Sequence, residues 1–330
     1  MFHEYGLTRQ PLVSAIIPTY NRAENLVEAV ESALAQSYPH REVIVVDDGS
    51  TDDTQARLGK YLDNVIYIRQ RRRGSSAARN RGMEHSRGEL IAFLDADDKW
   101  RPEKIQLQVD YLRAHPDIGI LCSDAREFTS EGTVSESFFA QFGEVPSDGF
   151  VFNTIAETAF PLTSTVMIRR TCIENGARFD EKLLNFQDID FFMRLNLRCR
   201  MGIMKEKLVE RRLHPGNVSK NHYRRFYYRT LAFKKILDDG TALTSGQRKR
   251  IRRLLAFSCL KVGDCYWDSL DLNEARSWYG RAIRFDHIGA DALLHAMLTF
   301  LPAEFITSLR GLKARLTRVA EPVSPHCQSD

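Results

Sequence analysis

Short apolar runs alternate with helical patterns from residue 12 to residue 124, and this alternation limits the possible folds more than any other feature. The runs are rich in Val and Ile, as in "LVSAIIP" (12–18) and "EVIVVDD" (42–48). Between them, apolar residues recur at helical spacing, as in "AENLVEAVESALAQ" (23–36). Such strands between helices are typical of a Rossmann-like, mostly parallel α/β sheet with helices on both faces. The pattern predicts strands at 12–18, 42–48, 64–70, 89–95 and 118–124, and helices at 23–36, 52–60, 75–86 and 102–115.

The pattern weakens after residue 124. Residues 125–160 are polar and rich in Phe, which favours a long excursion such as a lid or an acceptor-binding loop. A second apolar run at 164–170 is followed by a predicted helix at 185–198 and a strand at 200–210.

The chain is helical in pattern from about residue 222 onward. Within it, residues 260–286 have the spacing of one tetratricopeptide-like hairpin, although one such unit is not an array. We therefore expect a main domain at 1–220 and a helical C-terminal extension at 221–330. The final "EPVSPHCQSD" is expected to be disordered.

Composition is that of an ordinary globular protein, with 43% apolar and 27% charged residues. The formal net charge of +4 is too small to indicate nucleic acid as a partner. Arg-rich runs at 69–73 and 248–253 could meet phosphates or an anionic membrane, but such runs are more often solvated faces.

Cysteine usage and apolar content favour a cytoplasmic protein. The six cysteines contain no C-x-x-C pair, so we expect reduced thiols and no zinc. The N-terminus lacks the organisation of a signal peptide, and no apolar stretch reaches the ~18 residues of a transmembrane helix. Residues 292–316 combine apolar and basic side chains and could lie on the inner face of a membrane. A packed C-terminal helix is the alternative.

An acidic segment, "AFLDADDKWRP" (92–102), ends the fourth predicted strand. Asp95, Asp97 and Asp98 would repel one another near a core unless a cation or a proton compensates. One Asp would suffice to cap the following helix. Three of them indicate a divalent cation, and Asp95-x-Asp97 supplies the hard oxygen ligands that Mg²⁺ or Mn²⁺ prefers.

The motifs along residues 12–220 resemble those of family 2 glycosyltransferases of the GT-A fold. They follow one another in the order of that family: "IIPTYNR" (16–22), "VIVVDDGSTDDT" (43–54), "GSSAARNRG" (74–82), "GELIAFLDADD" (88–98), "NFQDIDFF" (185–192) and "HPGNVS" (214–219). Each motif alone is weak, and "GSSAARNRG" is neither a P-loop nor a dinucleotide fingerprint.

The resemblance implies how a nucleotide-sugar is bound. Asp48 would accept a hydrogen bond from the nucleobase, whereas Asp47 is expected to be structural. Arg79 would lie near the sugar nucleotide, with helix packing as its alternative role, and Asp95 would order the ribose or the water shell of the metal. The expected nucleotide-sugar residues are Pro18, Thr19, Tyr20, Asp48, Arg79, Asp95 and Ala96.

The resemblance also implies a metal site and a catalytic base. Asp97 would be the direct metal ligand, and His214 would lie near the diphosphate or the metal. Asp188 would take the proton of the acceptor hydroxyl, with Asp190 as its rival. The family often has Glu before this Asp, whereas this chain has Gln187.

These expectations describe an inverting, metal-dependent glycosyltransferase. It would move a sugar from a nucleotide-diphosphate sugar, a UDP-sugar by preference, to a hydroxyl of a glycan or lipid-linked saccharide. Two alternatives stay open: a non-catalytic binding or scaffold protein, and a sugar-nucleotide pyrophosphorylase. The second lacks support because "PTYNRAEN" follows the first strand where a Gly-rich basic loop would be expected.

Overall fold

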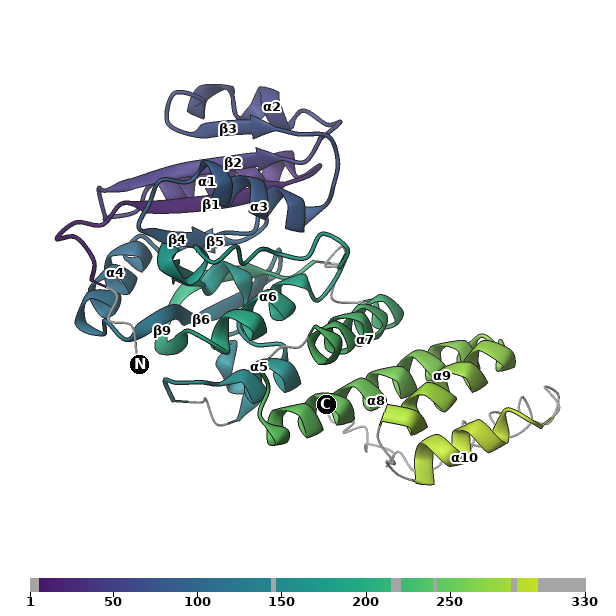
Figure 1. The fold of residues 1–330 in the computed structure, drawn as a ribbon. Coiled ribbons are helices and arrows are strands. Elements are labelled where there is room, and N and C mark those ends of the chain that lie inside the picture. The colour runs from purple at the N-terminus through teal and green to yellow at the C-terminus, as the bar shows by residue number, and fades with distance from the viewer. Residues whose placement is uncertain (1–5, 144–146, 215–220, 240–241, 286–289, 302–330) are drawn as a thin grey trace, which may run out of the picture. The chain divides into compact units, whose positions relative to one another are not determined.

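The structure, a computed structural model, describes residues 6–143, 147–214, 221–239, 242–285 and 290–301 (Figure 1). The chain divides into two compact units, Met1–Ile251 and Arg252–Asp330.

One sheet organises the first unit. Within the described residues it has nine strands, in the order β3-β2-β1-β4-β8-β6-β9-β5, with β7 paired to β6. Its N-terminal half is parallel, and Val13 of β1 lies beside Arg41 of β2 and Leu90 of β4. The strands of this half are β1 (Val13–Thr19), β2 (Arg41–Asp47), β3 (Ile66–Arg69) and β4 (Leu90–Phe93).

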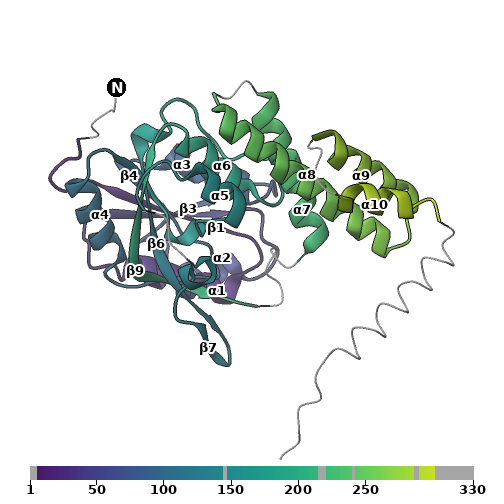
Figure 2. The ribbon, with the colours of Figure 1, turned by 90° about the horizontal axis from the view of Figure 1, so that it is seen from below.

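Helices cover both faces of this half (Figure 2). The connections from β1 to β2 and from β2 to β3, which contain α1 and α2, lie on one face. On the other face lies α3, which precedes β4, together with α5 (Phe152–Thr158) and α6 (Gln187–Asn196). The helical segments up to residue 114 are α1 (Ala23–Leu34), α2 (Thr54–Arg57), the 3₁₀ helix η1 (Gly59–Tyr61), α3 (Ser75–His85) and α4 (Lys104–Ala114).

The other half of the sheet is mixed. The apolar run predicted at 164–170 forms a short strand, β8, that runs antiparallel between β4 and β6. β9 is parallel to β6, whereas β5 is antiparallel to β9 and β7 to β6. The sheet is therefore parallel from β3 to β4 and mixed beyond. These strands are β5 (Lys99–Trp100), β6 (Ile118–Thr129), β7 (Gly132–Ser135), β8 (Met167–Arg169) and β9 (Arg200–Arg212).

The core lies between the sheet and its helices. Every residue of β1 is buried, as its run of Val, Ile and small residues predicts. α3 approaches β1 closely at Gly82, where a Cβ would lie 2.4 Å from Cγ2 of Ile16. This close contact explains why the segment "RNRG" ends in glycine.

The Phe-rich stretch after β6 packs on itself. The rings of Phe138, Phe139, Phe142 and Phe160 contact one another with centroids 5.1–6.4 Å apart. Three of the four are buried, so these residues form a small apolar cluster. The helical segments between β7 and β9 are η2 (Phe139–Phe142), α5 (Phe152–Thr158), η3 (Thr163–Thr165), η4 (Arg170–Cys172) and α6 (Gln187–Asn196).

The C-terminal part is helical, as predicted, and comprises α7 (His222–Asp238), α8 (Ser245–Asp268), α9 (Leu272–Phe285) and α10 (Ala290–Leu298). The expected domain boundary near residue 220 precedes α7, but α7 belongs to the first compact unit. Lys235 pairs with Asp180 at 2.6 Å, and Arg229 donates to the carbonyl of Ala156 at 3.1 Å.

α8 and α9 approach each other closely at Gly263, and their likeness to a tetratricopeptide hairpin stays a prediction. A Cβ on Gly263 would lie 2.5 Å from the ring of Tyr279. In the described part of the chain, no helix is both long and apolar enough to span a membrane. The basic and apolar residues at 305–318 and the final "EPVSPHCQSD" lie outside the described residues.

Candidate functional site

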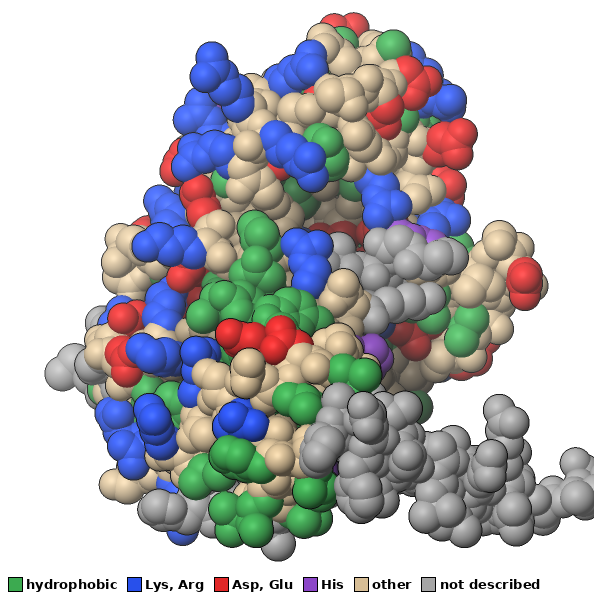
Figure 3. Space-filling model, turned by 90° about the vertical axis from the view of Figure 1, so that its right-hand side faces the viewer, with side chains coloured by type: hydrophobic (Ala, Val, Ile, Leu, Met, Phe, Trp, Pro, Cys, Tyr) green, Lys and Arg blue, Asp and Glu red, His purple; other side chains and the backbone are tan. Residues whose placement is uncertain are grey.

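A cavity of about 440 Å³ lies where the carboxyl ends of β1 and β4 meet the start of α6. Figure 3 faces this edge of the sheet, and acidic side chains are visible at the bottom of its recess. Asp48 and His214 lie outside the lining. The predicted residues that line the cavity are Pro18, Thr19, Tyr20, Arg79, Asp95, Ala96, Asp97 and Asp188.

A tight turn after β4 holds the three aspartates, and the N–H of Asp98 donates to the carbonyl of Asp95 at 3.0 Å. The buried carboxylate of Asp98 accepts from Ser164 Oγ at 2.6 Å and from the N–H of Arg212 at 3.0 Å. Burial, together with the charges of Asp97 and Asp95, raises the pKa of Asp98 to about 8. The turn therefore concentrates negative charge where a cation would relieve it.

Arg79 connects α3 to this turn. Its Nη2 donates to Asp95 Oδ1 at 2.6 Å. Desolvation raises the pKa of Asp95, the Arg79 guanidinium opposes that rise, and the charge of Asp97 adds to it. Nε and Nη1 of Arg79 and Oγ1 of Thr19 are buried and bond to none of the residues that the structure describes. Because buried polar atoms normally have partners, these atoms fit a polar ligand in the cavity.

Asp97, which lines the cavity, forms a pair with His214. His214 Nε2 lies 3.0 Å from Asp97 Oδ2, and the two side chains are 17% and 21% exposed. Among the residues described, no three His, Cys, Asp or Glu side chains are grouped so that they could hold a metal by themselves. Mg²⁺ is commonly held by one or two carboxylates plus substrate phosphates. The pair and its acidic neighbours fit a donor set of that partial kind.

Asp48 is buried beneath the loop that follows β3. Its carboxylate accepts from Gln70 Nε2 and from the N–H groups of residues 73–74 at 2.7–2.8 Å. The loop then lies beside Tyr20, and the guanidinium of Arg72 is 4.1 Å from the centroid of the Tyr20 ring. Asp48 thus shapes this loop, and its contact with a nucleobase stays a prediction.

Asp188 lies in the first turn of α6, where the helix dipole favours a negative charge. Its Oδ1 accepts from the N–H of Ile189 at 2.8 Å, and its Oδ2 accepts from Thr163 Oγ1 at 3.2 Å. Asp190, two residues further on, is fully buried and pairs with Arg194 at 2.6 Å. Of the two rival carboxylates, Asp188 lines the cavity and Asp190 does not.

The turn before β8 belongs to the site although no motif in the sequence indicated it. Thr163 and Ser164 reach Asp188 and Asp98 although 25 and 66 residues separate the paired positions along the chain. The only local signal is the run of hydroxyl residues in "PLTST". Asp98, Arg211 and Arg212 also line the cavity. Lining residues that were not predicted are Arg22, Ser75, Leu162, Leu184, Asn185, Phe186 and Gln187.

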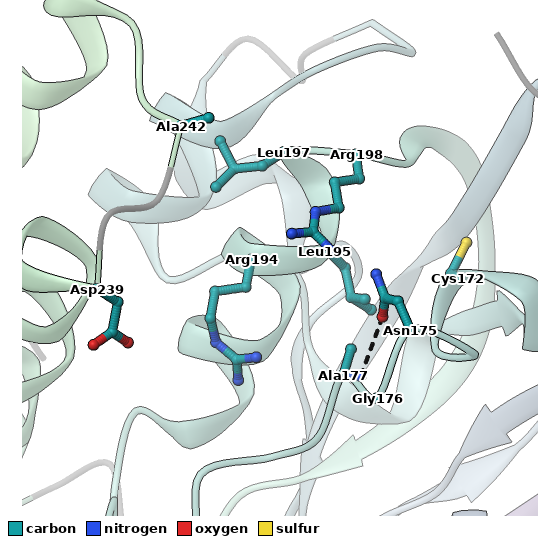
Figure 4. Close-up of a pocket in the computed structure, with 10 residues that line it drawn as sticks. All are labelled: Cys172, Asn175, Gly176, Ala177, Arg194, Leu195, Leu197, Arg198, Asp239 and Ala242. Atoms are coloured by element: carbon teal, nitrogen blue, oxygen red, sulfur yellow. Dashed lines mark hydrogen bonds between the residues drawn. The ribbon is translucent and has the colours of Figure 1, made fainter. Parts of the chain in front are cut away.

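A second cavity, also of about 440 Å³, lies beside the C-terminal end of α6 (Figure 4). Its lining includes Arg194, which is engaged by Asp190, and Cys172. A hydrogen bond to Cys199 and burial raise the pKa of the Cys172 thiol, which leaves it a poor nucleophile. None of the predicted site residues lines this cavity, so it is not the candidate active site.

The sequence is similar to proteins of one family. A family model described as "Glycosyl transferase family 2" matches residues 14–172. TuaG of Bacillus subtilis (strain 168), named for teichuronic acid biosynthesis, is 32% identical over 65% of this chain and 84% of its own length. WfaP of Escherichia coli, named a UDP-Glc:alpha-D-GlcNAc-diphosphoundecaprenol beta-1,3-glucosyltransferase, is 29% identical over 68% of this chain and 86% of its own.

The fold is similar to that of solved GT-A glycosyltransferases. S. aureus TarS 1–349, solved with UDP, matches with a TM-score of 0.61 at 22% identity, over 83% of this chain and 80% of its own. The mannosyltransferase PcManGT from Pyrobaculum calidifontis, solved with GDP-Man and Mn²⁺, matches with a TM-score of 0.60 at 22% identity, over 94% and 86%. The predicted fold class is confirmed. The 32% identity to TuaG across most of that relative, together with the family match at residues 14–172, shows that the chain belongs to glycosyltransferase family 2.

Proposed function

We propose that this protein is an inverting glycosyltransferase that moves a sugar from a UDP-sugar to a hydroxyl of a glycan or lipid-linked saccharide. The observation that carries the proposal is the convergence of the Asp95–Asp97 turn and Asp188 on one cavity. A transferase must hold a donor diphosphate and an acceptor hydroxyl side by side. In this proposal the Asp95–Asp97 turn serves the diphosphate and Asp188 serves the hydroxyl.

In the proposed reaction, Asp188 accepts the proton of the acceptor hydroxyl while that oxygen attacks the anomeric carbon of the donor. The bond from this carbon to the diphosphate oxygen breaks on the opposite face, and the nucleoside diphosphate leaves with the bonding electrons. Arg79, with two N–H groups that bond to no described residue, would bind the donor. Thr19 and Tyr20 would flank the nucleobase, and Asp48 would hold the adjoining loop in place.

We propose that Asp97 and His214 hold Mg²⁺ or Mn²⁺ together with the donor phosphates. The ion, when bound, neutralises the diphosphate and stabilises the leaving group. Asp95, held by Arg79, would stay beside the ion's water shell or the ribose, and the buried Asp98 would support the turn.

Relatives support the substrate classes. Solved structures of TarS contain UDP and UDP-GlcNAc, and the name of WfaP gives a UDP-sugar donor and a diphosphoundecaprenol acceptor. The structure of PcManGT contains GDP-Man and Mn²⁺. A UDP-sugar, a lipid-linked or glycan acceptor and a divalent cation are therefore the classes to test first.

A panel of nucleotide-sugars with Mn²⁺, Mg²⁺ or EDTA tests the proposal. A UDP-sugar should raise the melting temperature and be hydrolysed slowly, and both effects should need the metal. GDP-sugars serve as the matched comparison. Stabilisation without turnover, either hydrolysis or transfer to an added acceptor, would favour the binding or scaffold alternative, and release of a nucleoside triphosphate on adding pyrophosphate would favour the pyrophosphorylase.

We further propose that the helical extension takes no part in the chemistry and holds the enzyme near its acceptor. The enzyme is expected to act at the cytoplasmic face of a membrane. Support comes from exposed apolar residues on α10 and just beyond its end, which are Leu293, Leu294, Met297 and Phe300.

A further inference from the structure

The turn before β8 lies between the two halves of the proposed active site. It comprises η3 (Thr163–Thr165), and its hydroxyl side chains are buried, with Thr163 3% and Ser164 1% exposed. Neither residue belongs to the motifs in which the family resemblance was found. They nevertheless contact both acidic groups of the cavity, which are Asp188 and the turn 95–98.

Thr163 contacts the proposed base. Its Oγ1 donates to Asp188 Oδ2 at 3.2 Å, while Asp188 Oδ1 accepts from the N–H of Ile189. One lone pair on each carboxylate oxygen is thereby committed to a fixed donor. These two bonds restrict the carboxylate to one orientation, which leaves its remaining lone pairs for a ligand in the cavity.

Ser164 contacts the acidic turn. Its Oγ donates to Asp98 Oδ2 at 2.6 Å and accepts from the N–H of Asp95 at 3.1 Å. A single hydroxyl therefore joins both ends of the turn that carries Asp97. Because this hydroxyl is buried, its two hydrogen bonds should hold the turn firmly.

The turn is itself anchored to rigid elements. Trp100 Nε1 donates to the carbonyl of Ser164 at 2.8 Å, and Gln108 Nε2 donates to the carbonyl of Thr165 at 2.9 Å. The N–H of Phe93, at the end of β4, donates to the carbonyl of Val166 at 3.3 Å. The turn thus has fixed partners on β5, α4 and β4.

We propose that Thr163 and Ser164 are positioning residues that set the separation between the base Asp188 and the donor-binding turn 95–98. They are adjacent, so about 3.8 Å separates their Cα atoms, and that short span joins the acceptor side of the cavity to the donor side. The inference rests on the proposed transferase function and adds to it how the distance between Asp188 and the turn 95–98 is fixed.

The two hydroxyls should therefore have separable effects. Thr163→Val keeps the shape of the side chain but removes the donor to Asp188, so kcat for transfer should fall about 10- to 100-fold with donor affinity unchanged. Thr163→Ser restores a hydroxyl and should recover most of the rate. Ser164→Ala should instead weaken metal-dependent UDP binding by about 10-fold, because the acidic turn loses its link.

Thr165→Val is the matched control. The hydroxyl of Thr165 is equally buried but donates to the carbonyl of Leu162 within the turn, at 2.7 Å, and touches neither carboxylate. Its removal should change neither kcat nor UDP affinity by more than about 2-fold. All variants are measured as full chains, with melting temperatures recorded alongside.

The proposal is overturned if Thr163→Val transfers at the wild-type rate, or if Thr165→Val loses as much activity as Thr163→Val. Equal effects of Thr163→Val and Ser164→Ala on donor affinity would also overturn it, since the two roles would not be separate. The wild-type chain and Asp188→Asn distinguish these failures from failure of the function itself. An active wild type with an inactive Asp188→Asn upholds the transferase even where the Thr163 result contradicts the inference.

Discussion

Neighbouring aspartates in this protein have different environments, and the environment decides what each can do. Asp47 accepts from the N–H of Ser50 and the hydroxyl of Tyr67 at 2.8 and 2.6 Å, as expected of a structural residue. Asp98 is buried with a raised pKa. Asp97 and Asp188 are partly exposed and line the cavity. Chemistry is therefore expected at the last two.

Asp97→Ala should abolish turnover and greatly weaken metal-dependent UDP binding while the fold survives, because the partly exposed carboxylate supports no core contact. Calorimetric titration with UDP, with Mn²⁺ or with EDTA, measures the effect. Asp110→Ala, on the exposed side of α4, is the control and should bind normally. Normal transfer by Asp97→Ala in the presence of Mn²⁺ would show that the D-x-D assignment is wrong.

Asp188→Asn keeps the size and polarity of the side chain but cannot accept a proton at neutral pH. Donor binding should persist while the rate of transfer falls by about 10²- to 10⁴-fold. Asp190→Asn is the contrasting variant, because it leaves Arg194 without its buried partner and should lower the free energy of unfolding by about 3 kcal/mol. Equal loss of donor binding and rate in Asp188→Asn would make Asp188 structural.

At the scale of single elements, α4 carries an unusual buried cation. Lys104 is fully buried, its Nζ donates to Gln108 Oε1 at 2.7 Å, and it lies 4.2 Å from the centroid of the Trp100 ring. Burial lowers the pKa of Lys104 to about 7. In the folded protein Lys104 therefore loses its proton near pH 7, whereas in the unfolded chain it keeps the proton up to its ordinary pKa of about 10.4.

The stability of the wild-type protein should consequently rise with pH from about 7 to 10, since the unfolded chain binds more protons over that range. Lys104→Met removes this titration. The free energy of unfolding of Lys104→Met should therefore exceed that of the wild type. The difference should be greatest at or below pH 7, on the order of 4 kcal/mol, and should shrink towards pH 10. Urea unfolding of both proteins at pH 7 and pH 10 checks this, and a difference that is constant with pH would contradict it.

At the scale of the whole molecule, the helical extension has an apolar surface that the described structure leaves open. Leu293, Leu294, Met297 and Phe300 are 52–71% exposed and recur at the spacing of one helical face. Along the sequence, basic residues follow at 310, 313, 315 and 318. Each basic side chain near an anionic surface contributes about 1 kcal/mol, which is enough for reversible association when several act together.

Full-length protein should therefore co-sediment with anionic liposomes at low salt and be released at high salt. A chain truncated after residue 290 should not bind, and Met297→Glu with Phe300→Glu should bind more weakly. Neutral phosphatidylcholine liposomes are the control. Absence of binding by the full chain at low salt, or equal binding after truncation, would remove the membrane role.

The sequence by itself determined the elements and the residues at their ends. Apolar runs with Val and Ile specify strands wherever both faces are covered, so β1, β2 and β4 were predicted within two residues. Asp95 and Asp97 follow β4 directly, so their place at the carboxyl edge is fixed by local order along the chain. The order of the motifs along residues 12–220 indicated the family.

Tertiary structure alone decided which side chains meet. β8 is too short for its apolar pattern to reveal an antiparallel partner, and its place between β4 and β6 depends on pairing with distant strands. Asp190 is paired with Arg194 and with Lys235 of α7, whereas Asp188 lines the cavity, and the sequence could not separate these environments. Thr163 and Ser164 act across 25 and 66 residues of chain. Hydrogen bonds of that kind leave no periodic trace in a sequence, because they depend on where the folded backbone brings two single residues together.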